Sequence, residues 1–348
     1  MYGRLLLASA LGGTFCAAQI TDPLPNPGPS GLTVVVEPWI TIPASRPTSS
    51  QKTRINHLKP CPDGTRLFCN DLNDGNLWVI PNRTAATATK FLSLRTYYPS
   101  FTDDTGLGTG FASFAFHPEF STPGAPGYGK FYTAHSDEST ACDYAGPLTS
   151  GVTAQVGVIT EWTMTNPADN ALTSSPPNFT RRVLLRIGFP HDYHDTQEVS
   201  FNPTAAPGDE DYGCLFVCVG DGGSIVLDQP GNINRPDSPL GCIHRIVPVL
   251  ASATSGGYTA SDFTLSANGN YYIPSGPANA NPLVATPDPT PGDGFPVVRE
   301  IYAMGFRNPH RISWDSAGTH KMFCGNIGEN LVEEIELVRK GRNYGWPH

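Results

Sequence analysis

The sequence has few charged residues and no stretch in which basic residues gather. Only 15% of its 348 residues are Asp, Glu, Lys or Arg, and the formal net charge is −9. Binding to nucleic acid needs clustered Lys and Arg that neutralise phosphates, so this composition argues against a nucleic-acid partner. The apolar run Leu5–Phe15 is shorter than the ~20 residues that cross a bilayer, so we expect no membrane span.

Several motifs of catalytic and metal sites are also missing. The sequence has no GxSxG motif, which removes the usual signature of a serine hydrolase, and no cysteine pair with zinc-type CxxC spacing. The glycine-rich stretch Gly220–Gly223 lacks the Lys-Ser/Thr of a P-loop and opens no helix. We therefore predict a tight turn there, and no phosphate site.

Glycine and proline, in contrast, are abundant. The 36 glycines and 34 prolines, together with the low charge, are typical of many short strands joined by turns, and they argue against long helices. We predict an all-β fold. A chain of this length is compatible with one long all-β domain or with two domains.

The N-terminus has the pattern of an export signal. Arg4 precedes the apolar run, and small residues follow at Ala17 and Ala18, which predicts a signal peptide over residues 1–18 and a secreted or periplasmic protein. Residues 19–53 are rich in Pro and Ser and are predicted to form an N-terminal arm. The sequons at Asn82 and Asn178 could accept glycans only in a eukaryotic secretory route.

Seven cysteines remain after removal of the signal peptide. In an oxidising compartment we expect some of them to form disulfides, with at least one left unpaired because the number is odd. Cys214 and Cys218 are too far apart to pair with each other if they share a strand, because four residues of extended chain span about 13 Å. The seven are Cys61, Cys69, Cys142, Cys214, Cys218, Cys242 and Cys324.

From about Arg54 onward one local pattern recurs. An apolar strand leads into a polar or proline turn, then a glycine, and then an apolar-aromatic step that opens a second strand. Copies spaced more widely than the ~40–50 residues of a compact blade indicate a β-propeller with long loop insertions. A β-sandwich would also give alternating strands, but it would not explain the recurring unit. The four copies begin at His57, Phe114, Val199 and Ile312.

The segment His191–Asp195 is the densest cluster of titratable residues. A histidine beside a carboxylate can stay neutral near pH 7 and accept a proton from a substrate hydroxyl, which makes His194 a candidate general base. The alternative is an ordinary hydrated loop histidine. A metal site would need more histidines than His191 and His194 in this loop, and no third partner is evident.

Near the C-terminus, Arg307, Asn308 and Pro309 form a second candidate site. The arginine offers a fork of donors, the asparagine offers a donor and an acceptor, and the proline fixes the backbone behind them. This makeup suits an anion or quinone clamp, although a solvated turn has the same residue types. The acidic run that includes Glu329, Glu333, Glu334 and Glu336 is a possible source of oxygen ligands for calcium, or a solvated strand edge.

Taken in order, these segments resemble the soluble quinoprotein sugar dehydrogenases of the glucose/sorbosone dehydrogenase group, over about residues 54–348. The family is a six-bladed β-propeller that binds pyrroloquinoline quinone (PQQ) and calcium. Because the chain stops just after its Asn-Tyr-Gly-Trp-Pro turn, the resemblance implies a C-terminally truncated propeller. The resembling segments are Gly110–Phe120, His194–Pro203, Leu215–Asp221, Gly241–Ile246, Tyr302–Pro309, Glu333–Leu337 and Asn343–Pro347.

The resemblance also implies roles for individual residues. His194 would be the general base on the anomeric hydroxyl of an aldose, Arg307 would polarise the quinone carbonyl, and Asn308 would hold the quinone. The main-chain carbonyls of Gly328 and Glu329 would bind the calcium beside the cofactor. Glu333, Glu334 and Tyr344 would form a second, structural calcium site.

The implied function is oxidation of an aldose sugar, with hydride transfer to PQQ and electrons passed to an external acceptor; the oligomeric state is open. The alternative is a non-catalytic extracellular ligand-binding propeller, since a fold does not fix a function. Two departures from the family favour this alternative. Tyr193 stands where an acidic residue often precedes the histidine, and Gly108 stands where some members have a cofactor-contacting glutamine.

Overall fold

The computed structural model describes residues 31, 33–43, 54–103, 108–145, 153–225, 230–329 and 332–347. The chain divides into two units, residues 1–39 and 40–348. The predicted signal peptide and most of the predicted arm lie outside the described residues. In the described part of the first unit, residues 33–39 form no regular element.

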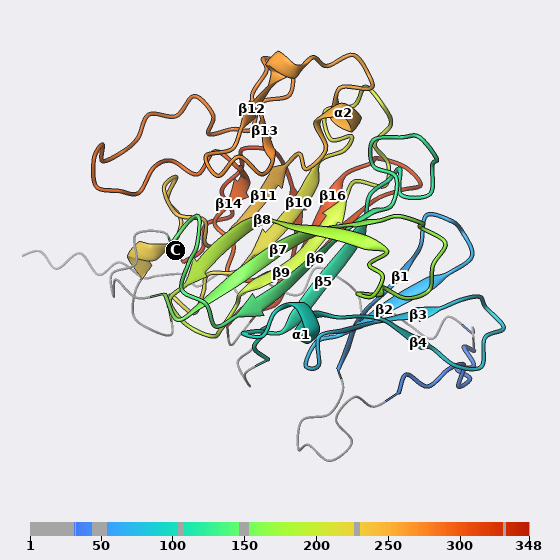
Figure 1. Cartoon of the computed structure of the whole chain (residues 1–348). Helices are drawn as coiled ribbons and strands as arrows, with labels where there is room; N and C mark the ends of the chain where they lie inside the picture. Colours follow the sequence, from blue (N-terminus) through green and yellow to red (C-terminus); the bar gives the residue numbers. More distant parts are fainter. Residues whose placement is uncertain are drawn as a thin grey trace, which may run out of the picture. The chain divides into compact units, whose positions relative to one another are not determined.

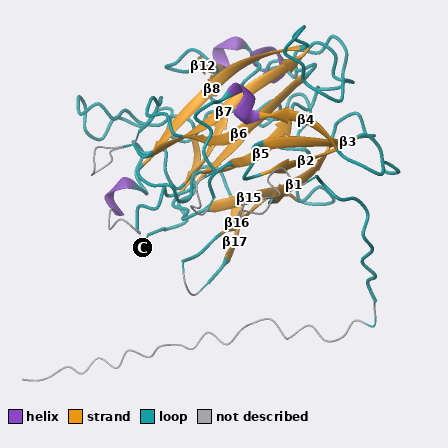
Figure 2. Ribbon diagram, turned by 60° about the horizontal axis from the view of Figure 1, so that its bottom comes forward, coloured by secondary structure: helices purple, strands orange, loops and turns teal. Residues whose placement is uncertain are grey.

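The second unit is built almost entirely from antiparallel sheets, as Figures 1 and 2 show. In the first two sheets the strands follow one another in chain order, so that each strand pairs with the next one along the chain. The first blade contains β1 (Ile55–Pro60), β2 (Leu67–Asp71), β3 (Asn76–Ile80) and β4 (Thr89–Ser93), and the second contains β5 (Phe111–Phe116), β6 (Lys130–Asp137), β7 (Gln155–Met164) and β8 (Phe179–Phe189).

The third sheet keeps this plan but receives an insertion before its last strand. The insertion holds α2 (Leu250–Ala253) and the hairpin of β12 (Phe263–Leu265) and β13 (Tyr272–Pro274), and α1 (Leu94–Tyr97) follows the first blade. The third blade contains β9 (Thr196–Phe201), β10 (Leu215–Val219), β11 (Cys242–Ile246) and β14 (Ile301–Met304), and the fourth contains β15 (Pro309–Trp314), β16 (Met322–Asn326) and β17 (Glu334–Val338).

The all-β, propeller-type prediction is confirmed, and the described residues hold four blade sheets, where the family's count is six. Each copy of the recurring sequence pattern forms the first hairpin of one blade: β1–β2, β5–β6, β9–β10 and β15–β16. The repeated turn therefore marks the start of each blade. The wide spacing of the copies comes from long loops and from the insertion in the third blade.

The first strands of the blades lie together. Strand β9 contacts both β5 and β15, and β1 contacts β5. Polar side chains connect them: Lys59 Nζ is 3.1 Å from Glu198 Oε1, and the Ile312 amide donates to Glu198 Oε2 at 3.0 Å. Glu198 of β9 therefore links the first strands of the first, third and fourth blades.

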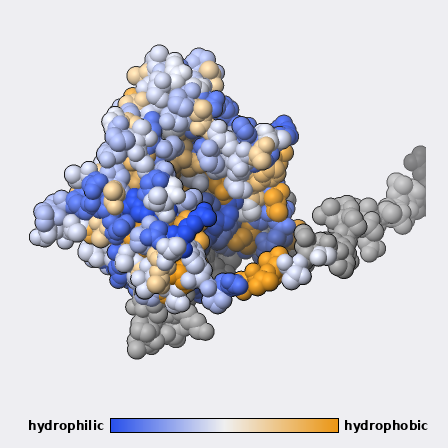
Figure 3. Space-filling view, turned by 90° about the vertical axis from the view of Figure 1, so that its right-hand side faces the viewer, coloured by the Kyte–Doolittle hydropathy of each residue, from blue (hydrophilic) through white to orange (hydrophobic). Residues whose placement is uncertain are grey.

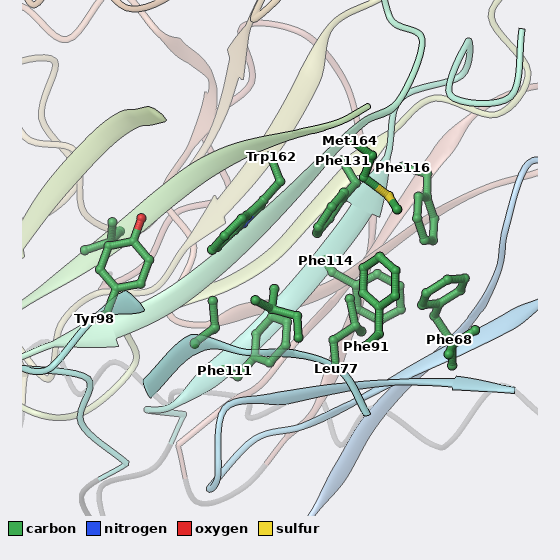
Figure 4. Close-up of a cluster of buried hydrophobic side chains, with 14 of the residues drawn as sticks. Phe68, Leu77, Phe91, Tyr98, Phe111, Phe114, Phe116, Phe131, Trp162 and Met164 are labelled. Carbon is green, nitrogen blue, oxygen red and sulfur yellow. The ribbon is translucent and has the colours of Figure 1, made fainter. Parts of the chain in front are cut away.

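Aromatic side chains fill the space between the first and second blades (Figure 4). Phe68 contacts Phe91 and Phe116 edge-on, with ring centroids 5.0 and 4.9 Å apart, and Phe131 stacks on Trp162 at 6.0 Å. Offset and edge-on pairs of this kind add to the stabilisation from burial. Two further apolar clusters repeat this packing between the following blades.

The face in Figure 3 is mostly polar and shows hydrophobic colouring only in limited areas. In the second unit the exposed large apolar side chains include Ile55 and Leu58 of β1 and Phe323 and Ile335 of the fourth blade. No helix in the described part of the chain combines the length and the apolar character that crossing a bilayer requires.

The expectation of disulfides is wrong for the described residues, because all seven cysteines there are unpaired. Six of them are buried. Burial raises the pKa of the Cys61 and Cys214 thiols to about 12, which keeps them protonated and unreactive. As expected, Cys214 and Cys218, which lie just before and within β10, do not pair.

Candidate active site

The loop between β8 and β9 carries His194 in a left-handed backbone conformation, with φ of 51°. The turn after β10 packs tightly on it. The Gly220 amide donates to the Asp195 carbonyl at 3.1 Å, and a Cβ built on Gly220 would lie 2.2 Å from the His194 carbonyl oxygen. Only glycine fits there, so the strand–turn sequence around Gly220 fixes the position of the histidine loop.

The imidazole of His194 is held by a carboxylate. His194 Nδ1 lies 2.6 Å from Asp221 Oδ1, and the two side chains are only 5% and 2% exposed. An ionised carboxylate can only accept, so we assign the proton to Nδ1. This leaves Nε2 as the basic atom, and it has no hydrogen-bond partner among the described residues.

A second donor links this pair to the C-terminal segment. Trp346 Nε1 donates to Asp221 Oδ2 at 3.0 Å, and the guanidinium of Arg307 lies 5.5 Å from the centre of the Trp346 ring. The Asp221 amide also donates to the Arg307 carbonyl at 2.8 Å. Three loops far apart in sequence therefore meet, and His194 and Arg307 are connected through two shared neighbours.

Arg307 and Asn308 each have a polar atom left without a partner. Arg307 Nη1 donates to the carbonyls of Ile327 and Gly328 at 3.3 and 2.8 Å, but its Nε is buried and unpaired, as is Asn308 Oδ1. An unsatisfied buried polar atom costs ~1–3 kcal/mol, so such atoms are rare unless a partner completes them. The two atoms are candidate contacts for a bound polar group.

Arg307 opens onto a cavity of about 280 Å³ at the start of the fourth blade. His194 is not among the residues that line it; its connection to this cavity runs through Asp221 and Trp346. The lining residues are Arg307, Asn326, Gly328, Glu329, Val332, Glu334 and Trp346.

The structure does not bring together the three residues expected at a second calcium site. Glu333 accepts from the Gly328 amide at 2.9 Å, and Glu334 accepts from Asn326 Nδ2 at 3.1 Å, both near the start of β17. The Tyr344 hydroxyl instead donates to the Leu337 carbonyl at 2.7 Å, near the end of β17. Among the described residues, no three His, Cys, Asp or Glu side chains are arranged to hold a metal.

The neighbours of His194 in this loop have contacts of their own, and the Tyr193 ring also lies 6.4 Å from the His194 ring. His191 stacks on Tyr193, with ring centroids 4.2 Å apart. Asp195 is fully buried, accepting from the Thr196 amide and from Gln155 Nε2, and burial raises its pKa to about 7 against the opposing effect of these and other hydrogen bonds. The Asp195 carboxyl therefore titrates near neutral pH, and the hydrogen bonds described here do not connect it to Asp221.

The sequence did not identify Asp221 and Trp346 as site residues. The predicted tight turn at Gly220–Gly223 is present, and Asp221 lies within it. The sequence did offer one signal for Asp221, which is a single carboxylate in a glycine-rich turn directly after the buried strand β10. Trp346 belongs to the predicted closing turn, whose backbone pairs with the end of β14 through the Tyr344 amide and the Met304 carbonyl at 2.9 Å.

The fold resembles the propellers of sugar dehydrogenases. The glucose/sorbosone dehydrogenase family matches residues 278–348. Among solved structures, the PQQ-bound aldose sugar dehydrogenase of Streptomyces coelicolor aligns with a TM-score of 0.51 at 16% identity, covering 88% of this chain and 66% of that one. The apo aldose sugar dehydrogenase of Escherichia coli aligns with a TM-score of 0.50 at 16% identity, covering 85% and 63%.

The chain also resembles curated proteins over parts of their length. The HIPL2 protein of Arabidopsis thaliana is 26% identical over 82% of this chain and 40% of its own length. Quinoprotein glucose dehydrogenase B of Acinetobacter calcoaceticus is 42% identical over 52 residues, which are 15% of this chain and 10% of that protein. The chain thus spans well under half the length of these relatives, and its resemblance to the glucose/sorbosone dehydrogenase group is confirmed.

Proposed function

We propose that the chain carries the base and the cofactor clamp of a quinoprotein oxidoreductase that oxidises an aldose at its anomeric hydroxyl. The observation that supports this most is the connected set His194–Asp221–Trp346–Arg307. It joins an oriented imidazole to a guanidinium beside an open cavity. Neither the histidine–carboxylate pair nor the arginine beside the cavity would by itself favour a redox site over a structural ion pair.

His194 is the proposed general base. Its Nε2 accepts the proton of the anomeric hydroxyl as the hydride leaves the same carbon, and the charge that develops on the ring is stabilised by Asp221. A carboxylate on Nδ1 both fixes the tautomer and favours the imidazolium, as in other histidine–carboxylate pairs. PQQ, when bound, supplies the hydride acceptor.

Arg307 and Asn308 fit the task of holding the quinone. The buried, unpaired Arg307 Nε and Asn308 Oδ1 supply one donor and one acceptor that the protein does not satisfy. The Trp346 ring beside Arg307 offers a flat apolar surface of the kind a planar cofactor packs against. We propose that Arg307 also polarises the acceptor carbonyl, which would make it catalytic as well as cofactor-binding.

Calcium at the Gly328 and Glu329 carbonyls is part of the proposal. These residues line the cavity together with the Glu334 carboxylate, and such oxygen donors suit calcium. The Gly328 carbonyl already accepts from Arg307, so calcium there requires Arg307 to turn toward another acceptor. Glu333, Glu334 and Tyr344 remain proposed ligands of a second calcium only if β17 and the closing turn rearrange.

A non-catalytic extracellular binding propeller is the second candidate. It is favoured by Arg307 Nη1, which is engaged by two main-chain carbonyls and is not open to a ligand. In either case we propose a secreted or periplasmic protein, and for the enzyme a small sugar as the substrate. The enzyme would also need an external electron acceptor.

A dye-linked oxidation assay separates the two candidates. The chain is supplied with PQQ, calcium and a panel of aldoses, and quinone binding is followed separately by fluorescence quenching. For the enzyme we expect turnover that His194→Ala removes while quinone binding persists. Sugar binding without turnover in the quinone-loaded protein would instead identify the binding propeller.

A further inference from the structure

Two turns at the outer side of the first and second blades contain sequons, and their geometry differs. Asn82 follows β3, in the turn that leads to β4, the outermost strand of the first blade (Figure 1). Asn178 lies immediately before β8 of the second blade. The rest of the molecule gives neither asparagine a role in the proposed reaction.

We propose that Asn82 is an N-glycosylation site and that Asn178 is not. The glycan donor is a lipid-linked oligosaccharide diphosphate, and the acceptor is the Asn82 side-chain amide. The new bond joins Nδ2 to the anomeric carbon of the first sugar. Nδ2 loses one proton, and the lipid diphosphate leaves with the bonding electrons.

The Asn82 turn presents its amide in a favourable way. Asn82 Oδ1 accepts from the Thr84 hydroxyl at 2.8 Å and from the Thr84 amide at 3.0 Å, which is an Asx turn. Asn82, Arg83 and Thr84 are all exposed. Because Oδ1 takes both bonds, Nδ2 is left toward solvent, without a partner among the described residues.

The hydrogen bonds of Asn82 are all local. The hydrogen bonds of the Asn82 side chain and carbonyl join residues two or three apart in the chain, so the same local geometry is accessible to a chain that has not yet folded. After folding the Asn82 turn stays at the outside of the first blade. A glycan on Nδ2 therefore displaces no protein contact.

Both polar atoms of the Asn178 side chain are hydrogen-bonded. Its Nδ2 donates to Asp169 Oδ2 and to the Ala171 carbonyl at 2.9 and 3.0 Å, and its Oδ1 accepts from the Thr173 amide at 2.8 Å. The half-buried side chain thereby holds the loop before β8. A sugar on Nδ2 would replace one of these donors and push this loop apart.

That loop is also packed against the first blade. The Leu172 amide donates to the Phe91 carbonyl of β4 at 2.8 Å, and a cavity of about 650 Å³ lies between the loop and the start of β4. Displacing Asn178 would therefore disturb contacts between two blades. A chain glycosylated there would fold with one of its blade contacts broken.

The test is expression of the full chain behind a host leader in a yeast or insect secretory route. We expect one endoglycosidase-sensitive mobility shift in the secreted protein. Asn82→Gln and Thr84→Ala should each remove it, Thr84→Ser should keep it, and the matched control Asn178→Gln should leave it unchanged. Deglycosylation in heavy-oxygen water should label Asn82 alone in the unmutated protein.

The labelling experiment needs no variant, so a folding failure of Asn82→Gln does not leave the proposal untested. A label at Asn178, a shift that survives in Asn82→Gln, or no glycan on the secreted chain would each overturn it. None of these results depends on redox activity, so they stand apart from the proposed function.

Discussion

Replacing Asp195 with asparagine should remove a large part of the pH dependence of stability. Asp195 is fully buried, and its pKa in the folded protein is about 7, against an ordinary value of 3.8. Between these two values the folded state binds a proton that the unfolded state has released. Stability from this group is therefore full at low pH and is lost as the pH rises through about 7.

The size of the effect follows from the shift. A shift of about three pKa units corresponds to about 4 kcal/mol, of which about 3 kcal/mol is lost between pH 5 and pH 8. Asparagine has the shape of the protonated acid and carries no charge. Asp195→Asn should therefore lack this loss, so that its stability relative to the wild type rises by about 3 kcal/mol between pH 5 and pH 8.

Urea unfolding at both pH values measures this difference directly. Gln155 can turn its amide to offer an oxygen to the new Asn amide, so the substitution need not break the contact. The matched control is Asp209→Asn, at an exposed loop position, which should change the pH dependence little. If Asp195→Asn loses stability between pH 5 and pH 8 in parallel with the wild type, the reasoning about the buried carboxyl is wrong.

Three further changes probe the site and the packing. Asp221→Asn should lower turnover more than 10-fold with little change in quinone affinity, because it disturbs the tautomer of His194 and leaves Arg307 and Asn308 in place. Steady-state kinetics measure the turnover and fluorescence quenching measures the quinone affinity. Equal losses of turnover and affinity would contradict this prediction. Phe131→Ala should cost about 3–5 kcal/mol in chemical unfolding, because the buried ring contacts three aromatic neighbours; a cost under 1 kcal/mol would contradict the packing. Gly305→Ala should destabilise the closing turn, because φ is +80° and the added Cβ would lie 2.1 Å from Asn343 Oδ1; an unchanged unfolding midpoint would count against that contact.

The sequence predicted the fold well because the propeller signal is local. Each blade begins with a strand, a turn and a strand that are close together in the chain, so the pattern at Phe114 or Val199 could be read directly. The third blade was harder to read, because its last strand β14 comes after the long insertion that follows β11. Pairing across such an insertion has no local signature.

The site was predicted only in part, because its connections are not local. His194 and Arg307 could be chosen by residue type, but the contact between them passes through Asp221 and Trp346, which lie 27 and 152 positions from His194. The disulfide prediction failed for a related reason. The number of cysteines says nothing about the distance and orientation of the thiols, and all seven are unpaired in the described residues.

The two halves of the site differ in how complete they are. On the His194 side, Asp221 accepts from the histidine, the tryptophan and the Gly223 amide, so the imidazole is fixed before any ligand arrives. On the Arg307 side, two buried polar atoms lack partners, and the fork is held by main-chain carbonyls of the segment that leads to β17.

A ligand that satisfies Arg307 Nε and Asn308 Oδ1 should therefore stabilise the fourth blade more than the third. Hydrogen exchange of the β16 and β17 amides should slow in the presence of PQQ, while the amides of β9 and β10 change little. The Asp221→Asn variant should show the same pattern, because it leaves the clamp intact. Equal protection of both blades, or protection confined to the histidine loop, would contradict the proposal that the ligand binds mainly to Arg307 and Asn308.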